Sequence, residues 1–268
     1  MDLDLDETGK TDFDLIYTQP DPRGYFGVLS GLDYRIPELA KPYFLKLIQE
    51  FREERRRTEA TVLDIGCSYG INAALLRCDS TMDEMAARYR SSAGLDTDAL
   101  AAVDRRFVDQ RAGLDGVRFV GFDASESALA YARAAGFVDD TLHADLEATD
   151  PTEAQRAVLA GVDIVVSTGC VGYVTEQTIG RVAEVGRPWM AHFVLRMFSF
   201  APIAERLSAL GYRTERVDGV FKQRRFASSD ERDQVIESLA AAGVDPSGLE
   251  SDGWLYAQLF VSRPRDTL

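Results

Sequence analysis

The stretch VLDIGCSYGINAALL, residues 62–76, decides the fold. Residues 61–65 form a short apolar run typical of a buried strand, residues 66–70 form a tight turn with glycine at both ends, and residues 71–77 have the apolar spacing of a helix. A glycine turn between a strand and a helix lets the backbone approach a ligand closely. We therefore expect a strand, a turn and a helix that together form part of a ligand-binding edge.

The chain after this stretch alternates between short apolar runs and amphipathic helical patterns. The further strands are predicted at 117–122, 140–143, 162–167, 189–195, 212–217 and 254–262, and the helices at 126–135, 151–159, 176–185, 203–210 and 230–242. Strands that alternate with helices favour βαβ units and a parallel sheet. We predict an α/β fold with a mostly parallel seven-stranded sheet, helices on both faces, and a last strand that runs antiparallel.

Two segments lie outside this alternation. Residues 79–115 contain two helical patterns, at 82–90 and 100–111, and the first follows a capping box formed by Thr81 and Glu84. We interpret them as a helical insertion that could serve as a dimer interface, a lid or both. Residues 1–58 form an N-terminal lid or helical segment, with turns and one short helix in the first forty residues and a helix at 41–57. Residues 59–268 form the sheet domain.

The composition excludes several classes of protein. A formal net charge of −14 would repel nucleic acid, because that affinity depends on Lys and Arg neutralising phosphates. Three scattered cysteines and two histidines support neither a disulfide framework nor a metal site. No apolar stretch is long enough to span a bilayer, and the acidic start has no signal-peptide pattern. We expect a cytoplasmic enzyme with no membrane partner.

Polar side chains follow three of the predicted strands. A nucleotide at the carboxyl ends of a parallel sheet needs a glycine turn, an acid for the ribose hydroxyls, and groups that recognise the base. VLDIGCSYGINAALL, VRFVGFDAS (117–125), HADLEA (143–148) and STGCVGYV (167–174) offer these groups in order. The cofactor-binding candidates are Asp64, Gly66, Ser68, Gly70, Asn72, Asp123, Ala124, Asp145, Leu146, Ser167, Thr168 and Gly169.

These blocks resemble the motifs of the class I Rossmann-like methyltransferases that depend on S-adenosylmethionine (SAM), over about residues 60 to 200. The resemblance implies a Rossmann-like fold with SAM as cofactor. It implies that Asp64, Gly66 and Gly70 contact the methionine part and ribose of SAM and that Asp123 holds the ribose hydroxyls. It also implies that Asp145 and Leu146 flank the adenine, and that residues 167–173 lie between the cofactor and a methyl acceptor.

The chain departs from the family's pattern in two places. The turn contains Ser68 where the commoner pattern has glycine, and Asp64 and Asp123 are much farther apart than the roughly 20 residues of a compact βαβ unit. The long separation is compatible with the resemblance if residues 79–115 are inserted. If one of the helices in residues 79–115 is instead the crossover between the first two strands, Asp123 loses its role in holding the ribose hydroxyls. Asp123 and Asp145 could also simply cap the helices that follow them.

The acceptor site is expected over the strand ends, beneath the N-terminal lid. The catalytic candidates, which would position a small-molecule acceptor, are Tyr17, Tyr25, Tyr173 and Arg196, with Arg23, Tyr34 and Arg225 as further candidates. Aromatic rings attract a sulfonium ion, and arginine binds a carboxylate bidentately. His192 lies inside a strongly apolar strand and is interpreted as a core residue, although an amine or phenol acceptor would need a base of this kind.

The resemblance predicts a methyltransferase that acts on a small molecule of secondary metabolism by O- or N-methylation, with a carboxylate or amino-acid-like acceptor as one case. SAM could instead be the only substrate, as in azetidine-2-carboxylate synthases, which release methylthioadenosine. A non-catalytic SAM-binding partner protein is a further alternative, and so is a homodimer. An NAD-dependent oxidoreductase would use a similar sheet but prefers G-x-G-x-x-G in its first turn, which this chain lacks.

Overall fold

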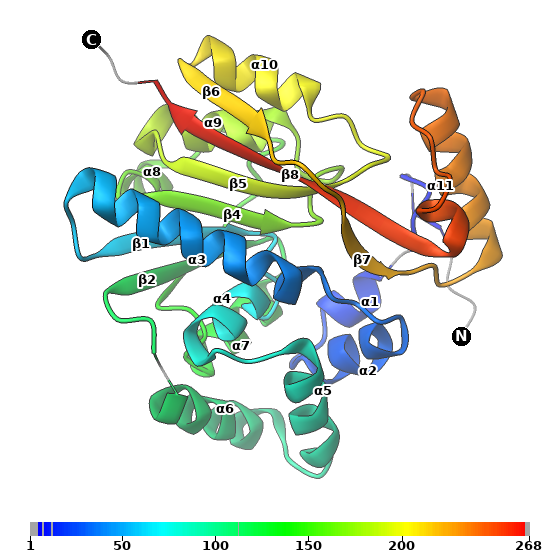
Figure 1. The fold of residues 1–268 in the computed structure, drawn as a ribbon. Helices are drawn as coiled ribbons and strands as arrows, with labels where there is room; N and C mark the ends of the chain where they lie inside the picture. The colour runs from blue at the N-terminus through cyan, green and yellow to red at the C-terminus, as the bar shows by residue number, and fades with distance from the viewer. Residues whose placement is uncertain (1–4, 7, 12, 112, 266–268) are drawn as a thin grey trace.

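The computed structural model describes residues 5, 6, 8–11, 13–111 and 113–265. Its centre is an eight-stranded sheet whose strands lie in the order β3-β2-β1-β4-β5-β8-β6, with β7 also paired to β8 (Figure 1). The strands are β1 (Ala60–Ile65), β2 (Val117–Asp123), β3 (Asp140–His143), β4 (Ile164–Thr168), β5 (Trp189–Leu195), β6 (Tyr212–Arg216), β7 (Phe221–Arg225) and β8 (Trp254–Pro264). β1 to β5 are parallel, whereas β8 is antiparallel to β5, β6 and β7.

Helices cover both faces of the sheet. They are α1 (Asp14–Tyr17), α2 (Arg23–Gly31), α3 (Ile36–Arg55), α4 (Ile71–Cys78), α5 (Met82–Ser91), α6 (Thr97–Arg111), α7 (Glu126–Ala134), α8 (Glu153–Leu159), α9 (Glu176–Gly186), α10 (Ala201–Ala209) and α11 (Ser229–Ala241), with a short 3-10 helix at Glu250–Asp252. α3, α4 and α7 share one apolar cluster with the sheet, and α8, α9 and α10 share another. The predicted Rossmann-like α/β fold is confirmed.

The central strands are apolar because both of their faces are buried. In β4, Ile164 and Val166 pack on the α3 side, and Val165 packs on the opposite side with α9 and α10. Burial on both faces removes the polar alternation that a half-exposed strand would show. The periodicity therefore predicted the position of this strand but not which face each residue occupies.

Three features of the fold differ from the expected ones. The sheet has eight strands rather than seven, because the basic segment Phe221–Arg225 forms β7. The described N-terminal residues contain two helices, α1 and α2, rather than one. α3 begins at Ile36, before the predicted start at residue 41, because Pro37 in its first turn needs no N–H partner there.

Residues 79–115 contribute two extra helices between β1 and β2, as the helical patterns predict. Asp104 of α6 is buried and accepts hydrogen bonds from the hydroxyls of Tyr89 on α5 and Tyr131 on α7, both at 2.7 Å. Arg88 also bonds to this carboxylate, at 3.0 Å. One buried carboxylate thus holds α5 and α6 against the sheet domain, with α4 as the crossover helix.

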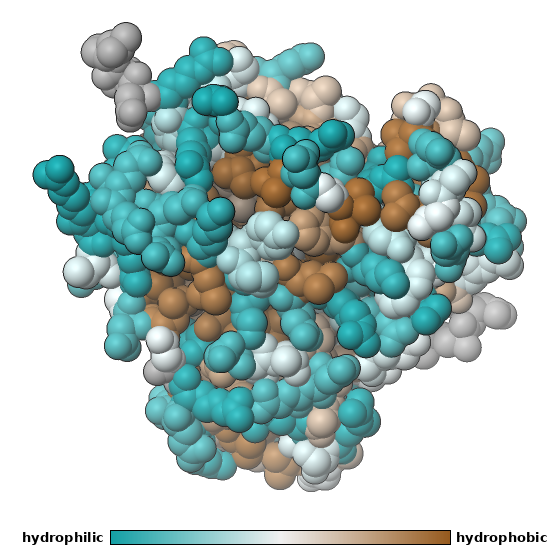
Figure 2. Space-filling model, viewed as in Figure 1, coloured by the Kyte–Doolittle hydropathy of each residue, from teal (hydrophilic) through white to brown (hydrophobic). Residues whose placement is uncertain are grey.

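The surface in Figure 2 is mainly hydrophilic, with hydrophobic side chains gathered across the middle of this face, where α3 and the antiparallel end of the sheet lie (Figures 1 and 2). Partly buried apolar residues packed there include Val217, Phe221 and Val261. Among the described residues, no helix combines the length and the apolar character that crossing a bilayer requires.

Candidate functional site

A cavity of about 620 Å³ lies at the carboxyl ends of the parallel strands. Its walls come from the ends of β1 to β4, from the N-terminal segment (the described part of residues 5–34), and from β7. The predicted residues that line it are Tyr17, Tyr25, Tyr34, Gly66, Ser68, Asn72, Asp123, Ala124, Asp145, Leu146, Thr168, Gly169 and Tyr173. The structure therefore brings most of the predicted cofactor-binding residues into one cavity.

A second cavity, of about 430 Å³, lies at the opposite ends of β4 and β5. Arginines line it, and its Asp163 is already bound to Arg57 at 2.7 Å and to the N–H of Thr61 at 2.9 Å. Ligands of open α/β sheets bind outside the carboxyl ends of the strands. The first cavity is therefore the candidate site.

The turn after β1 has three residues in the left-handed backbone region. Gly66 has a φ of 69°, Ser68 of 50° and Gly70 of 76°. A Cβ at Gly66 would lie 2.7 Å from the Cβ of Cys170, so only glycine fits there. Ser68 adopts the conformation that glycine favours, and its N–H donates to Asp123 Oδ2 at 2.8 Å. The serine thus preserves the turn at a cost in strain that this hydrogen bond offsets.

Asp123 lies at the end of β2, next to the turn. Its other oxygen, Oδ1, accepts from the N–H of Ser125 at 2.9 Å. Burial raises the pKa of this carboxyl group, and the backbone N–H donors of Ser125 and Ser68 oppose the rise. A carboxylate has about four lone-pair sites, more than these backbone donors occupy, so Asp123 can still accept from a ligand hydroxyl in the cavity. The helix cap itself is the side chain of Ser125, which accepts from Ala128 N–H.

Asp64 lies behind the cavity wall rather than in it. It is fully buried, and its Oδ1 accepts from Asn72 Nδ2 at 2.9 Å. The same Asn72 nitrogen lies 3.1 Å from the hydroxyl of Thr168, so one amide joins the ends of β1 and β4. Asp64 Oδ2 has no hydrogen-bond partner in the described part of the chain, and burial raises the pKa of this carboxyl group to about 7. Asn72 and Thr168, not Asp64, reach the cavity.

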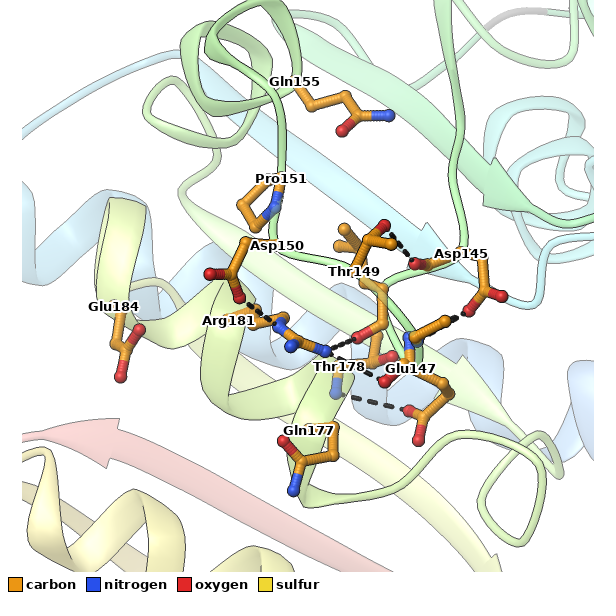
Figure 3. A network of polar contacts seen from close by, with 12 residues as sticks. Asp145, Glu147, Thr149, Asp150, Pro151, Gln155, Gln177, Thr178, Arg181 and Glu184 are labelled. Atoms are coloured by element: carbon orange, nitrogen blue, oxygen red, sulfur yellow. Dashed lines mark hydrogen bonds and ion pairs between the residues drawn. The ribbon is translucent and has the colours of Figure 1, made fainter.

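The loop after β3 carries the predicted Asp145 and Leu146. Asp145 Oδ1 accepts from the N–H groups of Glu147 and Ala148, so the aspartate caps this turn and not α8 (Figure 3). Leu146 is 1% exposed and presents its apolar side chain to the cavity. This pairing of a fixed turn with an apolar side chain offers a flat aromatic group both polar and apolar contacts.

Two residues that the sequence interpretation missed hold this loop in place (Figure 3). Glu147 accepts from the N–H and hydroxyl of Thr175 at 2.9 and 2.7 Å, which ties the loop to the start of α9. Arg181 of α9 donates to the carbonyls of Leu146 and Glu147 at 2.6 and 3.0 Å. Glu147 lies within the block at residues 143–148 but was not selected, and Arg181 lies outside every block, because each acts through a contact more than twenty-five residues away.

The N-terminal segment covers the cavity and is bonded to the strand ends. The hydroxyl of Tyr69 lies 2.9 Å from the carbonyl oxygens of both Ile16 and Gln19. Ser125 Oγ donates to the Tyr17 carbonyl at 2.9 Å. The ring of Tyr25 makes edge contacts with Tyr17, Tyr34 and Tyr69 at centroid distances of 5.8 to 6.2 Å. These contacts make an aromatic cover over the cavity.

The end of the cavity farthest along the sheet from Asp145 was not predicted. Lys10 and Thr11 of the N-terminal segment and Gln223 and Arg224 of β7 line it. Arg224 forms a bidentate ion pair with Glu231 of α11, at 2.9 and 2.6 Å, and Glu231 also accepts from the N–H of Thr11 at 2.8 Å. At this end, Arg225 was selected from the sequence, and its neighbours Gln223 and Arg224 were not.

The predicted arginines lie outside the cavity. Arg196 pairs with Glu250 and donates to the Asp245 carbonyl at 2.8 Å. Arg225 bonds to Asp33 at 2.7 Å, and Arg23 bonds to Asp21 and to the Leu95 carbonyl. Their partners are the chain's own groups, so these arginines hold elements together and do not line the candidate cavity.

Three further predicted residues lie beneath or beside the cavity. Ser167 is fully buried and its hydroxyl lies 2.8 Å from His192 Nδ1. Burial lowers the pKa of His192 to about 4, and this histidine does not line the cavity. Gly70 packs against Ala132 and Phe137 at the start of α4. His192 is thus the core histidine that the sequence favours, with Ser167 as its partner.

No protein-family model matches the chain, and no curated protein is detectably similar to it. Solved structures do match. One is a functionally unknown protein from Deinococcus radiodurans R1, with 16% identity, 78% of this chain and 81% of the other covered, and a TM-score of 0.40. Another is magnesium protoporphyrin IX methyltransferase from Synechocystis PCC 6803 with bound SAM, with 12% identity, 83% and 79% covered, and a TM-score of 0.40.

A SAM-dependent methyltransferase from Geobacter sulfurreducens in complex with S-adenosyl-L-homocysteine has 14% identity, 82% and 90% coverage, and a TM-score of 0.39. These identities are all below 25% and these TM-scores below 0.5. The solved structures that resemble this chain thus include SAM-dependent methyltransferases, and the assignment of a ligand to the cavity rests on the geometry described above.

Proposed function

We propose that this protein binds SAM in the cavity at the carboxyl ends of β1 to β4 and transfers its methyl group to a small molecule. The observation that carries the proposal is the bond between Asp123 and the Ser68 N–H, which places an acid with free lone pairs directly beside a backbone turn. Such an arrangement suits a ribose whose neighbouring groups must approach the backbone closely.

The rest of the cavity fits the other parts of SAM. The Asp145 turn and Leu146 suit the adenine, and Asn72 and Thr168 offer hydrogen bonds to the amino-acid part. The faces of Tyr17 and Tyr25 lie in the cover, where they can attract the sulfonium. In the described part of the chain, no cluster of side chains has the ligands for a metal ion, and the methyl transfer proposed here needs none.

The residues of the cavity would act mainly by alignment. The sulfonium already activates the methyl carbon, so the chain must hold the acceptor in line with it and exclude water. Among the described residues that line the cavity there is no histidine. Burial raises the pKa of the Tyr34 hydroxyl well above its ordinary value, so this group donates a hydrogen bond and does not remove a proton. This favours an acceptor that is already ionised, such as a carboxylate.

A second function remains in view because the cover is bonded to the strand ends by the chain's own groups. Tyr69 and Ser125 hold the N-terminal segment over one continuous cavity, which suits a reaction in which SAM is the sole substrate. In that reaction the amino nitrogen of SAM attacks its own γ-carbon, the bond from that carbon to sulfur breaks, and methylthioadenosine leaves.

The decisive experiment is incubation of the purified protein with SAM alone, with the adenosine-containing products followed by liquid chromatography and mass spectrometry. SAM that stays intact but binds with micromolar affinity in calorimetry supports the methyltransferase, whose acceptor is then sought among small carboxylic acids. Methylthioadenosine above a no-enzyme blank identifies SAM cleavage instead. Absence of SAM binding rejects both functions, and binding without turnover on any acceptor would indicate a non-catalytic SAM-binding protein.

A further inference from the structure

Lys10 is a buried cation without an acidic partner among the residues that the structure describes. Its side chain lines the cavity, and the residue is only 6% exposed. In the described part of the chain, its ammonium nitrogen makes no salt bridge; it lies over the ring of Tyr173, 4.1 Å from the centroid, and 5.4 Å from that of Phe198. A charge taken out of water is costly unless a partner compensates it.

The acids near Lys10 are committed to other groups. Asp6 binds the hydroxyls of Thr8 and Tyr173 and accepts from the backbone N–H of Lys10 at 3.2 Å. Glu231 is saturated by the bidentate Arg224. Burial lowers the pKa of Lys10 to about 8, and Asp6 only partly opposes this. The ammonium is therefore charged at neutral pH, and no described acid forms an ion pair with it.

Two further polar atoms at this end of the cavity are also unsatisfied. The hydroxyl of Thr11 and the side-chain oxygen of Gln223 are buried and have no hydrogen-bond partner among the described residues. The amide of Gln223 lies against Gly169, where a Cβ would be 2.4 Å from its nitrogen, so this side chain closes the cavity wall. Buried polar groups in native proteins are nearly always hydrogen-bonded, so two unsatisfied atoms beside a buried ammonium group indicate a ligand.

The charges of the cavity are arranged along its length. Asp123, Asp145 and Glu147 lie at the β2–β3 end, where the hydroxyl and amino donors of an adenosine would be received. Lys10 and Arg224 lie at the β7 end, and Arg224 is neutralised by Glu231. A ligand that fills the cavity must therefore carry hydrogen-bond donors at one end and an anion at the other.

We propose that Lys10, with Thr11 and Gln223, forms a carboxylate-binding subsite at the β7 end of the cavity. The carboxylate comes either from the amino-acid part of SAM or from a second, acidic substrate. This inference rests on the proposed function only for the identity of the nucleotide. The subsite itself is defined by side chains that the sequence motifs do not include.

The test uses Lys10→Met, which has a similar shape and no charge, with Lys46→Met as the matched control. Lys46 lies on α3 with a side chain 73% exposed, so its loss should change nothing. SAM and decarboxylated SAM, which differ only in the carboxylate, are titrated into each protein by calorimetry. A charge-assisted hydrogen bond lost from SAM lowers its affinity about ten- to a hundredfold. The affinity for decarboxylated SAM should not change.

If Lys10→Met binds SAM as the wild type does, the second source is tested on the protein saturated with S-adenosyl-L-homocysteine. Small aromatic and aliphatic acids are titrated against their amides. Preference for the acids in the wild type, lost in Lys10→Met, assigns the subsite to a second substrate. The proposal is overturned if wild type and variant have equal affinities both for the two forms of SAM and for the acids and amides. It is also overturned if the variant loses the same affinity for the acidic ligands as for the neutral ones.

Two controls separate this proposal from misfolding and from the proposed function. Lys10→Met removes an uncompensated buried charge, so its melting temperature should equal or exceed that of the wild type. If Lys10 had a purely structural role, the substitution would lower the melting temperature and reduce the affinity for every ligand by the same factor. If the wild type does not bind SAM, the proposed function fails; the acids and amides are then titrated into the protein alone, and a Lys10-dependent preference for acids still supports the subsite.

Discussion

The carboxylate of Asp123 accepts a hydrogen bond from the N–H of Ser68 at 2.8 Å, so the end of β2 holds the turn that follows β1. This relationship brings together two positions separated by 55 residues. It also explains how a serine occupies a left-handed position in the turn. The first prediction concerns this carboxylate.

Asp123→Asn should lower the affinity for SAM and the affinity for methylthioadenosine by a similar factor, about ten- to a hundredfold. Both ligands contain the ribose that the carboxylate would hold. Calorimetric titration measures both affinities. Asp140→Asn at the start of β3 is the control, since Asp140 is bonded to Arg118 and lies outside the cavity. Unchanged affinities in Asp123→Asn would contradict the assigned role.

Gly66→Ala should destabilise the protein and weaken SAM binding together. The left-handed φ costs alanine about 1 kcal/mol, and the added Cβ would lie 2.7 Å from the Cβ of Cys170. Gly248→Ala is a matched control, because Gly248 has a φ of 70° and nothing within 4 Å of the added Cβ. Urea unfolding and SAM calorimetry should show the strain in both variants but the loss of SAM affinity only in Gly66→Ala.

The contribution of Asp64 to the stability of the ligand-free protein should fall as pH rises from about 4 to about 7. Burial raises the pKa of Asp64 from 3.8 to about 7, so in this range the folded state holds more protons than the unfolded state. The loss is up to about 4 kcal/mol and is complete above pH 7. Asp64→Asn removes the titration, so the difference in unfolding free energy between wild type and variant should change with pH. A difference that stays constant from pH 4 to 8 would refute this.

Glu231→Gln should lower the free energy of unfolding by about 3–5 kcal/mol, because it leaves the buried guanidinium of Arg224 without its charge partner. Glu237→Gln on the exposed side of the same helix should change it by less than about 0.5 kcal/mol. Chemical denaturation compares the two variants. Similar small effects in both would mean that Arg224 finds another partner.

The sequence predicted the parallel part of the fold well and the antiparallel edge less well. The boundaries of Asp140–His143 and Trp189–Leu195 were predicted to the residue, because apolar runs between helices have few other interpretations. β7 was missed because FKQRR is mostly polar, although Gln223 and Arg224 are buried. Such a strand is stabilised by pairing with β8, which local pattern does not reveal.

Prediction of the candidate site had the same limit. Motif residues such as Gly66, Asp123 and Leu146 were found because strand ends meet at one edge of a parallel sheet. Arg225 was chosen in place of Arg224 because alternate residues of a strand face opposite sides, and the register was unknown. Lys10 escaped notice because its environment is made by tertiary contacts with Tyr173 and Phe198.

The hydrogen bond from Thr11 to Glu231 joins positions 220 residues apart. A ribosome makes the chain from the N-terminus at about 5–20 residues per second, so α11 is synthesised many seconds after the N-terminal segment. Until then the N–H of Thr11 has no acceptor in Glu231, and Lys10 cannot be held at the cavity by this contact. During synthesis, the glycine turn and Asp123 can therefore meet early, whereas the β7 end of the cavity is completed last.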